Sequence, residues 1–125
     1  MNILSKSDAL HVDKSEGTRV DYYLRDEYEI HYNEQAPHSI QTWHSHEHIW
    51  ETLFIVEGEL TSKWKDDSGK ETKQVVKPGD VIETERSVHT FENHTNELTK
   101  FLVVKQVLSG ENKVQLLKND KVVEV

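Results

Sequence analysis

The sequence predicts an all-β protein, either a sandwich or a barrel, and three observations support this class. Short runs of alternating apolar and polar residues, typical of half-buried strands, recur throughout the chain. Turn-forming residues separate these runs, as residues 66–70 and Pro78-Gly79 do. Beyond roughly the first dozen residues, no stretch keeps a helical periodicity. A chain of 125 residues with no linker or internal repeat is expected to form a single domain, residues 1–125.

The strands are expected at regular intervals. Residues 1–16 are polar and weakly patterned, and we expect them to form a loose lead-in. The predicted strands then occupy residues 18–24, 28–32, 38–42, 52–56, 60–65, 72–76, 81–84, 89–93 and 98–108. Residues 66–70 are a hairpin turn, and Pro78-Gly79 fits the central positions of a type II turn. In the tail, residues 114–118 and 121–125 are predicted to form a closing hairpin around Asn119-Asp120.

Composition narrows the possible partners. The formal net charge is −8, and lysines are interleaved with acids, so the chain lacks the basic stripe that a nucleic-acid backbone requires. No apolar run approaches the roughly 20 residues of a membrane-spanning helix, and the first residues lack the apolar core of a signal peptide. The chain has no cysteine, which excludes disulfides and thiolate chemistry. We therefore expect a cytoplasmic protein that binds neither nucleic acid nor membranes.

Potential metal ligands gather in residues 44–51, which hold three histidines and two glutamates. His44 and His46 are one residue apart, so an extended chain points both imidazoles to one face. Glu51 follows His46 by five residues, an odd spacing that would point it to the opposite face of an unbroken strand. It can join the histidines only if the chain bends within residues 47–50. His48 has the same parity as the other two histidines and is an alternative ligand.

A further imidazole lies well downstream of this window. His89 follows the Pro78-Gly79 turn and a strand-like run, and it shares its strand face with Phe91 and Asn93. Imidazole and carboxylate side chains at such spacings are typical ligands of a divalent metal. The sequence therefore predicts that His89 completes a metal site with ligands from the earlier window.

Both stretches resemble the motifs of the cupin superfamily. The first stretch has the spacing His44-x-His46-x4-Glu51-x6-Gly58, which is similar to that of the family's first motif. The second stretch is similar to the second motif, with Gly79 at its start and His89-x3-Asn93 at its end. The chain also departs from the family pattern. His38 stands where the first motif usually begins with glycine, and the segment between Gly79 and His89 is one residue shorter than usual. Glu85 and Ser87 fall roughly where proline and glycine are common.

The resemblance implies a double-stranded β-helix, the jelly-roll barrel of cupins, in which four residues hold one metal. These residues are His44, His46, Glu51 and His89. Three imidazoles and one carboxylate suit divalent Mn, Fe, Co, Ni, Cu or Zn, and the sequence does not rank these metals. Four protein ligands leave up to two positions open for water, dioxygen or a substrate.

The resemblance also favours a homodimer. If Glu51 faces the barrel interior, Leu53 and Ile55 line it, whereas Phe54 and Val56 face outward and need a cover. Another sheet, a terminal segment or a second subunit could cover them, and the resemblance favours the second subunit.

Several side chains near the predicted ligands are candidates to line the pocket. They are Trp43, His48, Trp50, Phe54, Phe91 and Asn93. Aromatic rings there would dry the pocket and shape it for a small substrate, although core packing explains each of them equally well. Lys100 and Gln106 share strand parity and are candidates to reach the interior.

Two functional hypotheses follow from this predicted site. The first is a metal-dependent enzyme, similar to a cupin dioxygenase or isomerase, that acts on a small organic molecule. Glu51 would be its catalytic residue, because a carboxylate beside the metal can also move protons. The alternative is a non-catalytic module in which the metal organises a pocket that binds or senses a small molecule.

Overall fold

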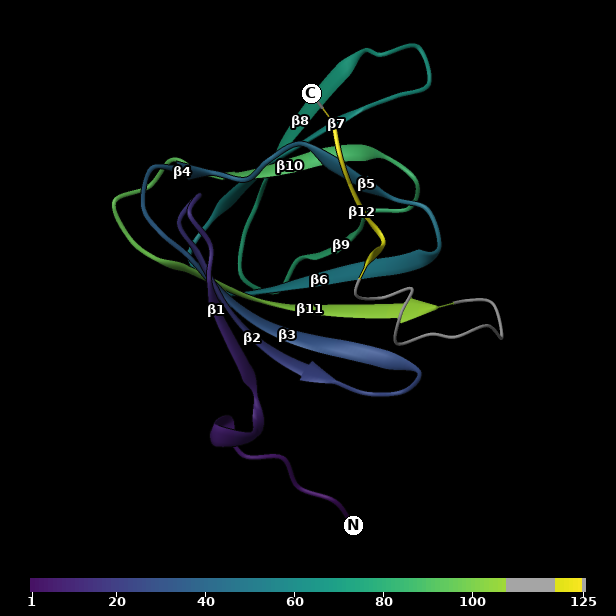
Figure 1. Ribbon diagram of the computed structural model, residues 1–125. Helices are drawn as coiled ribbons and strands as arrows, with labels where there is room; N and C mark the ends of the chain where they lie inside the picture. Colours follow the sequence, from purple (N-terminus) through teal and green to yellow (C-terminus); the bar gives the residue numbers. More distant parts are fainter. Residues whose placement is uncertain (108–118, 125) are drawn as a thin grey trace.

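The computed structural model describes residues 1–107 and 119–124, which form two antiparallel sheets that face one another (Figure 1). One sheet has the strand order β1-β2-β3-β11-β6-β9, and the other has the order β12-β5-β10-β7-β8 with β4 paired to β10. The strands are β1 (Leu10–Asp13), β2 (Thr18–Leu24), β3 (Tyr28–Gln35), β4 (Ser39–Ile40), β5 (His44–His46), β6 (Ile49–Glu57), β7 (Leu60–Lys65), β8 (Glu71–Val76), β9 (Val81–Glu83), β10 (Val88–Asn93), β11 (Thr99–Val107) and β12 (Lys121–Val123). A 3₁₀ helix, η1 (Lys6–Asp8), precedes β1. This is the predicted all-β, cupin-like jelly-roll architecture.

The described part of the chain contains no helix long and apolar enough to cross a membrane.

Strand β6 shows how the alternating pattern builds the interior. Leu53 and Ile55 are buried, whereas Phe54 and Val56 are 43% and 45% exposed on the outer face. This confirms the predicted orientation of all four side chains. Glu51 is buried on the same face as Leu53 and Ile55, because side chains two residues apart in a strand point the same way.

The interior of the sandwich changes from apolar to charged along β6 and its partner β11. Ile55 pairs with Phe101 and Leu53 pairs with Val103, and all four side chains belong to the main hydrophobic cluster. The remaining members of that cluster are Leu60, Val76 and Phe91. In the next inward-facing pair Glu51 lies opposite Lys105, and beyond it Ile49 and Val107 are again buried and apolar. The two charged side chains therefore lie between two apolar clusters, and this charged row of the interior is available for a site.

Two predicted turns form as expected. The N–H of Asp80 donates to the carbonyl of Lys77, and Gly79 has a φ of +93°, as a type II turn requires. Between β7 and β8, the N–H of Gly69 donates to the carbonyl of Asp66 and closes the hairpin. The segment 66–70 and Pro78-Gly79 thus separate the strands as predicted.

Gly58, the last residue of the first motif, has a strict packing requirement. Its φ is +86°, and a Cβ there would lie 2.8 Å from the carbonyl oxygen of Leu98 and 2.9 Å from Cα of Thr99. Backbone atoms cannot move away as the end of a flexible side chain can, so only glycine fits between β6 and β7.

Two of the departures from the cupin motifs occur at backbone positions that favour glycine. His38 and Glu85 have φ values of 54° and 53°, and they are the non-glycine residues with positive φ in the described part of the chain. A left-handed conformation is uncommon for a residue with a Cβ. The turn before His89 is stabilised by Ser87, whose N–H and hydroxyl both donate to the carbonyl of Thr84.

The expectation of a loose lead-in over residues 1–16 is wrong in part. Residues 10–13 form strand β1, which pairs with β2 at the edge of the first sheet, and His11 contacts the carboxylate of Asp21. Three of the four residues of β1 are exposed, and none is buried. Leu10-His11-Val12-Asp13 does alternate apolar and polar residues, but the run is only four residues long and follows a polar segment, so the pattern was too short to predict a strand.

Part of the predicted closing hairpin is described. Residues 121–123 form strand β12, which pairs with β5, the strand that carries His44 and His46 (Figure 1). The other predicted arm of a closing hairpin, residues 114–118, lies outside the described residues.

Candidate metal centre

Strand β5 presents two histidines to the interior. His44 and His46 are buried, and Ser45 between them is half-buried. The alternation follows from the extended backbone, and it places both imidazoles on the inner face as predicted.

The chain then turns at Glu47 and His48, where it leaves the second sheet and enters the first. The backbone N–H groups of these two residues donate to the carboxylate of Asp120 at 3.1 Å and 2.8 Å. Strand β6 begins at Ile49, so Glu51 enters the interior from the sheet opposite the histidines. The predicted bend within residues 47–50 is therefore present, and it reconciles the odd spacing between His46 and Glu51.

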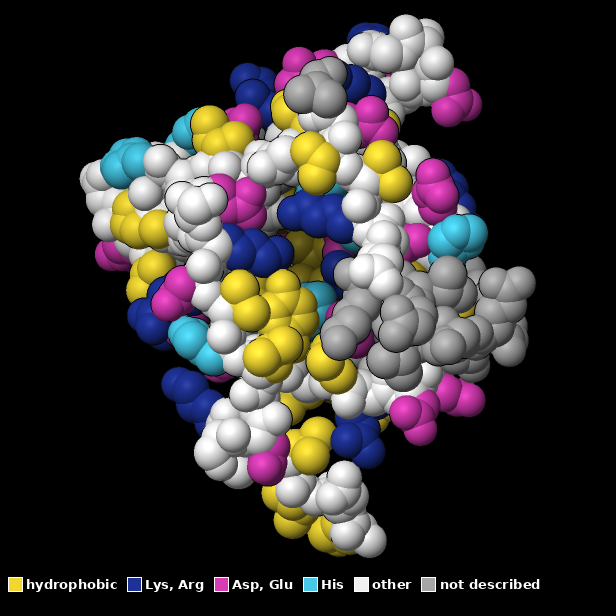
Figure 2. Space-filling model, in the orientation of Figure 1, with side chains coloured by type: hydrophobic (Ala, Val, Ile, Leu, Met, Phe, Trp, Pro, Cys, Tyr) yellow, Lys and Arg dark blue, Asp and Glu magenta, His cyan; other side chains and the backbone are white. Residues whose placement is uncertain are grey.

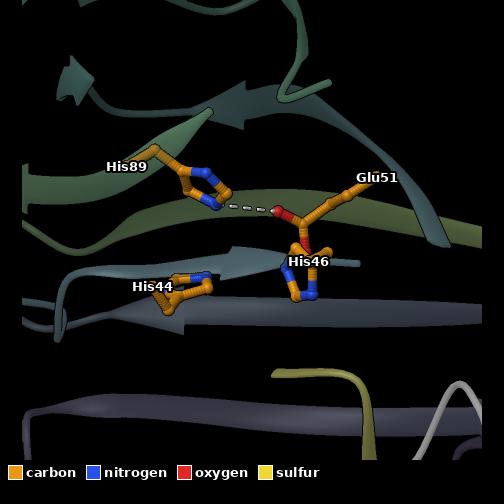
Figure 3. Close-up of side chains that lie close together, drawn as sticks. All are labelled: His44, His46, Glu51 and His89. Carbon is orange, nitrogen blue, oxygen red and sulfur yellow. Dashed lines mark ion pairs between the residues drawn. The ribbon is translucent and has the colours of Figure 1, made fainter. Parts of the chain in front are cut away.

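Strand β10 supplies the third imidazole. His89 pairs in register with His44, and the centroids of the two rings are 4.5 Å apart. Figure 3 shows the three histidines and Glu51 converging on one point from the two sheets. Their candidate ligand atoms all lie within 4.8 Å of one another. The carboxylate of Glu51 lies 3.3 Å from Nε2 of His46 and 3.4 Å from Nε2 of His89.

Hydrogen bonds orient two of the rings for metal binding. Nδ1 of His44 lies 2.7 Å from the carbonyl of Thr42, and Nδ1 of His89 lies 2.9 Å from the carbonyl of Ser87. A carbonyl only accepts, so each Nδ1 carries the proton and each Nε2 keeps a free lone pair. This is the usual arrangement of histidines that bind a metal through one nitrogen and donate from the other.

The centre leaves buried polar atoms without hydrogen bonds. Nε2 of His46 and Nε2 of His89 are both buried, and neither has a hydrogen-bond partner among the described residues. Such atoms are costly unless something satisfies them. A divalent cation between the rings and Glu51 would do so, and these residues therefore fit one metal ion.

The protonation states also suit a cation. Burial, followed by the nearby charge of His89, lowers the pKa of His44 to about 3, so its imidazole is neutral at physiological pH. Burial alone would raise the pKa of Glu51, but contacts with His46 and His89 and the charge of Lys105 bring it well below its usual value. The centre therefore combines neutral imidazole with ionised carboxylate, the forms that bind a metal.

We expect the stability of the metal-free protein to fall as the pH is lowered. The unfolded chain takes up a proton at His44 near pH 6.5, whereas the folded chain does so only near pH 3, so unfolding binds protons between these values. Lowering the pH from 6.5 to 5.0 should therefore reduce the free energy of unfolding by about 2 kcal/mol. Urea unfolding of the chelator-treated protein at several pH values would measure this decrease.

His44→Gln should make the free energy of unfolding less dependent on pH, whereas His48→Ala should leave its pH dependence unchanged. The same pH dependence in the wild type and both variants would contradict the expectation.

Phe91 is the pocket candidate that lies beside the centre. Its ring is buried, and its centroid is 5.5 Å from that of His89. The two tryptophans lie farther out: Trp43 packs under Nζ of Lys65, and the indole of Trp50 donates to Glu83 at 3.3 Å.

The other pocket candidates lie away from the metal centre. Phe54 is on the outer face of β6, so its predicted role in the pocket is wrong. The side chain of His48 is 52% exposed, and His48 is absent from the candidate ligand cluster. Asn93 is fully buried, but its amide donates to the carbonyls of Gln35 and Glu97, which makes it a structural residue.

A small cavity of about 40 Å³ adjoins the centre, and its lining includes His44, Glu51 and Phe91. Room for one water needs about 10–15 Å³ on this scale, so the cavity would hold about three waters. A larger cavity of about 790 Å³ lies beside the β7–β8 hairpin, and it meets the ligand set at His89. The smaller cavity borders two of the four ligands and is the better candidate to hold a small ligand beside the centre.

Sequence reasoning missed two residues that contact the ligands. Lys105 pairs with Glu51 across β11 and β6, and its Nζ lies 3.6 Å from the Glu51 carboxylate. The predicted interior residues of β11, Lys100 and Gln106, have the opposite parity and do not line this cavity. Because both faces of β11 carry apolar residues, the sequence did not show which face points inward.

Asp120 is the second residue that sequence reasoning missed. Its carboxylate lies 3.4 Å from Nδ1 of His46, but it is 74 residues farther along the chain and belongs to no motif.

The chain is similar to known cupins in both sequence and structure. A family model of the cupin domain matches residues 30–105. A variant of oxalate decarboxylase from Bacillus subtilis is similar over 97% of this chain and 32% of that chain, with a TM-score of 0.76 and 17% identity. An oxalate oxidase is similar over 84% of this chain and 59% of that chain, with a TM-score of 0.69 and 18% identity.

These likenesses to solved structures show the fold alone, because the identities are low and the chain spans only about a third of the length of the decarboxylase. No curated protein matches the chain. The family model, however, covers more than half of the sequence and includes the three histidines and the glutamate of the candidate centre. The chain belongs to the cupin domain family.

Proposed function

We propose that this cupin is a metal-dependent enzyme that acts on a small organic molecule. One observation carries the proposal: the buried ligand set borders a cavity, so protein atoms do not enclose it on every side. A structural metal site is normally closed by protein ligands, whereas a catalytic one keeps a position for substrate. A bound divalent metal would polarise the substrate oxygen or carry electrons.

The residues of the chain supply the remaining chemistry. His44, His46 and His89 would hold the metal, with the first and last fixed by their bonds to backbone carbonyls. Glu51 would be a ligand and also the group that accepts or returns a proton, because its carboxylate borders the cavity. Phe91 and the apolar residues behind it would keep water away from the bound molecule.

The type of reaction within this proposal is oxygenation or isomerisation. The names of the similar solved structures add oxalate to the molecules that a site on this fold can use. Small diols, hydroxy acids and oxalate are therefore the compounds to assay first, with oxygen consumption and product analysis as parallel measurements.

The proposal predicts that Glu51→Gln retains the metal but loses turnover. The amide keeps an oxygen that can bind the metal but cannot accept a proton, so the rate should fall by about 100-fold or more. Glu47→Gln is the matched control, because Glu47 lies four residues earlier with a side chain that is 68% exposed. Unchanged turnover in Glu51→Gln would exclude its role in proton transfer. Saturable binding with no product from any compound would instead support the non-catalytic binding module.

We also propose that the outer face of the first sheet joins two copies of this chain. Phe54 pairs with Leu102 on one side and Val81 on the other, which forms an exposed apolar row across three strands. A flat row of this kind can pack against itself across a two-fold axis. Sedimentation equilibrium should show a dimer that Phe54→Lys dissociates and Val75→Lys, at an exposed valine on β8, does not. A monomeric wild-type protein would exclude the proposal.

A further inference from the structure

Three lysines lie around the small cavity at the metal centre, in a protein whose formal net charge is −8. They come from distant parts of the chain: Lys14 follows β1, Lys105 is on β11 and Lys121 begins β12. Figure 2 shows a hollow on this face with dark-blue Lys or Arg side chains beside it and hydrophobic side chains in its depth. The charge at the cavity is therefore opposite in sign to that of the whole molecule.

Strand register explains why two of the lysines face the centre. Lys105 pairs with Glu51, and Lys121 pairs with His46. Residues paired across antiparallel strands have side chains on the same face, so each lysine shares the face of a metal ligand. One lysine comes from each sheet, so their ammonium groups approach the cavity from both sides.

These positive charges have few internal partners. In residues 1–107 and 119–124, the ammonium groups of Lys14 and Lys121 form no ion pair, and Lys105 has only the 3.6 Å contact with Glu51. Glu16 also borders the cavity, but its carboxylate accepts from the N–H of Thr42 at 3.0 Å. Burial, followed by the charge of Lys105, lowers the pKa of Lys14. Three lysines and two glutamates thus border the cavity, which leaves one positive charge in excess, and an anion from outside would balance it.

We propose that Lys14, Lys105 and Lys121 form an anion site that holds the carboxylate of a small organic acid beside the metal centre. The size of the cavity, about 40 Å³, limits the ligand to a few heavy atoms. A two- or three-carbon acid with a second oxygen could contact both the lysines and an open metal position. The inference rests on the proposed function for one point, that this acid is the substrate; the lysine site itself does not depend on turnover.

The test is calorimetric titration of the metal-loaded protein with glycolate and with ethylene glycol, its neutral counterpart. Glycolate should bind, and Lys14→Gln and Lys121→Gln should each weaken its binding by about tenfold, since a hydrogen bond to a charged group is worth that much or more. Lys73→Gln, on the exposed strand β8, is the control and should have no effect. Ethylene glycol should bind more weakly, and the lysine variants should leave its affinity unchanged.

Metal analysis and chelator-treated protein separate this inference from the proposed function. The lysine variants should keep the wild-type metal content, and glycolate should still bind the chelator-treated protein in a Lys14- and Lys121-dependent way. Glycolate binding that both variants leave within twofold would overturn the anion site even if turnover is found. Tighter binding of inorganic phosphate than of glycolate would overturn its assignment to a carboxylate. Absence of metal from the wild-type protein would overturn the proposed function, while the titration of the chelator-treated protein would still decide the lysine site.

Discussion

Replacement of His46 or His89 by alanine should remove the metal from this protein. Each histidine supplies one of four ligand groups, and its Nε2 has no other hydrogen-bond partner among the described residues. Substitutions around metal ligands typically cost 10–100-fold in affinity, so loss of a ligand itself should cost about 100-fold or more. Mass spectrometry of untagged protein should find about one equivalent of a divalent metal in the wild type and very little in either variant.

His48→Ala is the matched control for this prediction. His48 belongs to the same histidine-rich stretch, but its side chain is 52% exposed and lies outside the ligand cluster. The variant should keep the full metal content, and circular dichroism should show the same folded state for all proteins. A full equivalent in His89→Ala, or an equal loss in His48→Ala, would falsify the assignment of the ligands. A redox-active metal would direct the assays to oxygen chemistry, and zinc would direct them to isomerisation, hydrolysis or binding.

Asn93→Ala should destabilise the fold strongly while leaving the metal centre intact. The Asn93 side chain is fully buried, and its amide donates to the carbonyls of Gln35 and Glu97. Its oxygen accepts from the N–H and the hydroxyl of Thr95. Removing these bonds leaves buried backbone groups unsatisfied, which should cost about 2–4 kcal/mol. The melting temperature should fall by about 10 °C.

The control for this prediction is Asn96→Ala. Asn96 is exposed, and its side chain forms an exposed hydrogen bond with the ring of His38, so the free energy of unfolding should change by about 0.5 kcal/mol or less. Thermal unfolding followed by circular dichroism measures both variants, and metal analysis shows whether the centre is retained. If Asn93→Ala loses metal at a temperature where it remains folded, Asn93 acts on the site and its structural role is the wrong interpretation.

Local sequence patterns predict most of the strands and turns of the fold. Most strands between residues 18 and 107, the hairpin at 66–70 and the Pro78-Gly79 turn were predictable, because alternation and turn chemistry act within a few residues. The predicted strands did not include β5 or the first three residues of β6. The inward direction of Leu53 and Ile55 followed from the period of two. Strand β1 was missed, because its alternating run is only four residues long and the strand is held by its pairing with β2 and not by buried side chains.

The sequence by itself determined the candidate metal ligands, because their spacing within two short stretches matches the cupin motifs. The tertiary structure decided everything that depends on register between strands far apart in the chain. It places Lys105 beside Glu51 and Lys121 beside His46, and it binds the amide of Asn93 to the carbonyls of Gln35 and Glu97, away from the predicted pocket. The physical reason is that a strand's own sequence specifies which residues share a face, whereas the neighbours across that face depend on how distant strands pair.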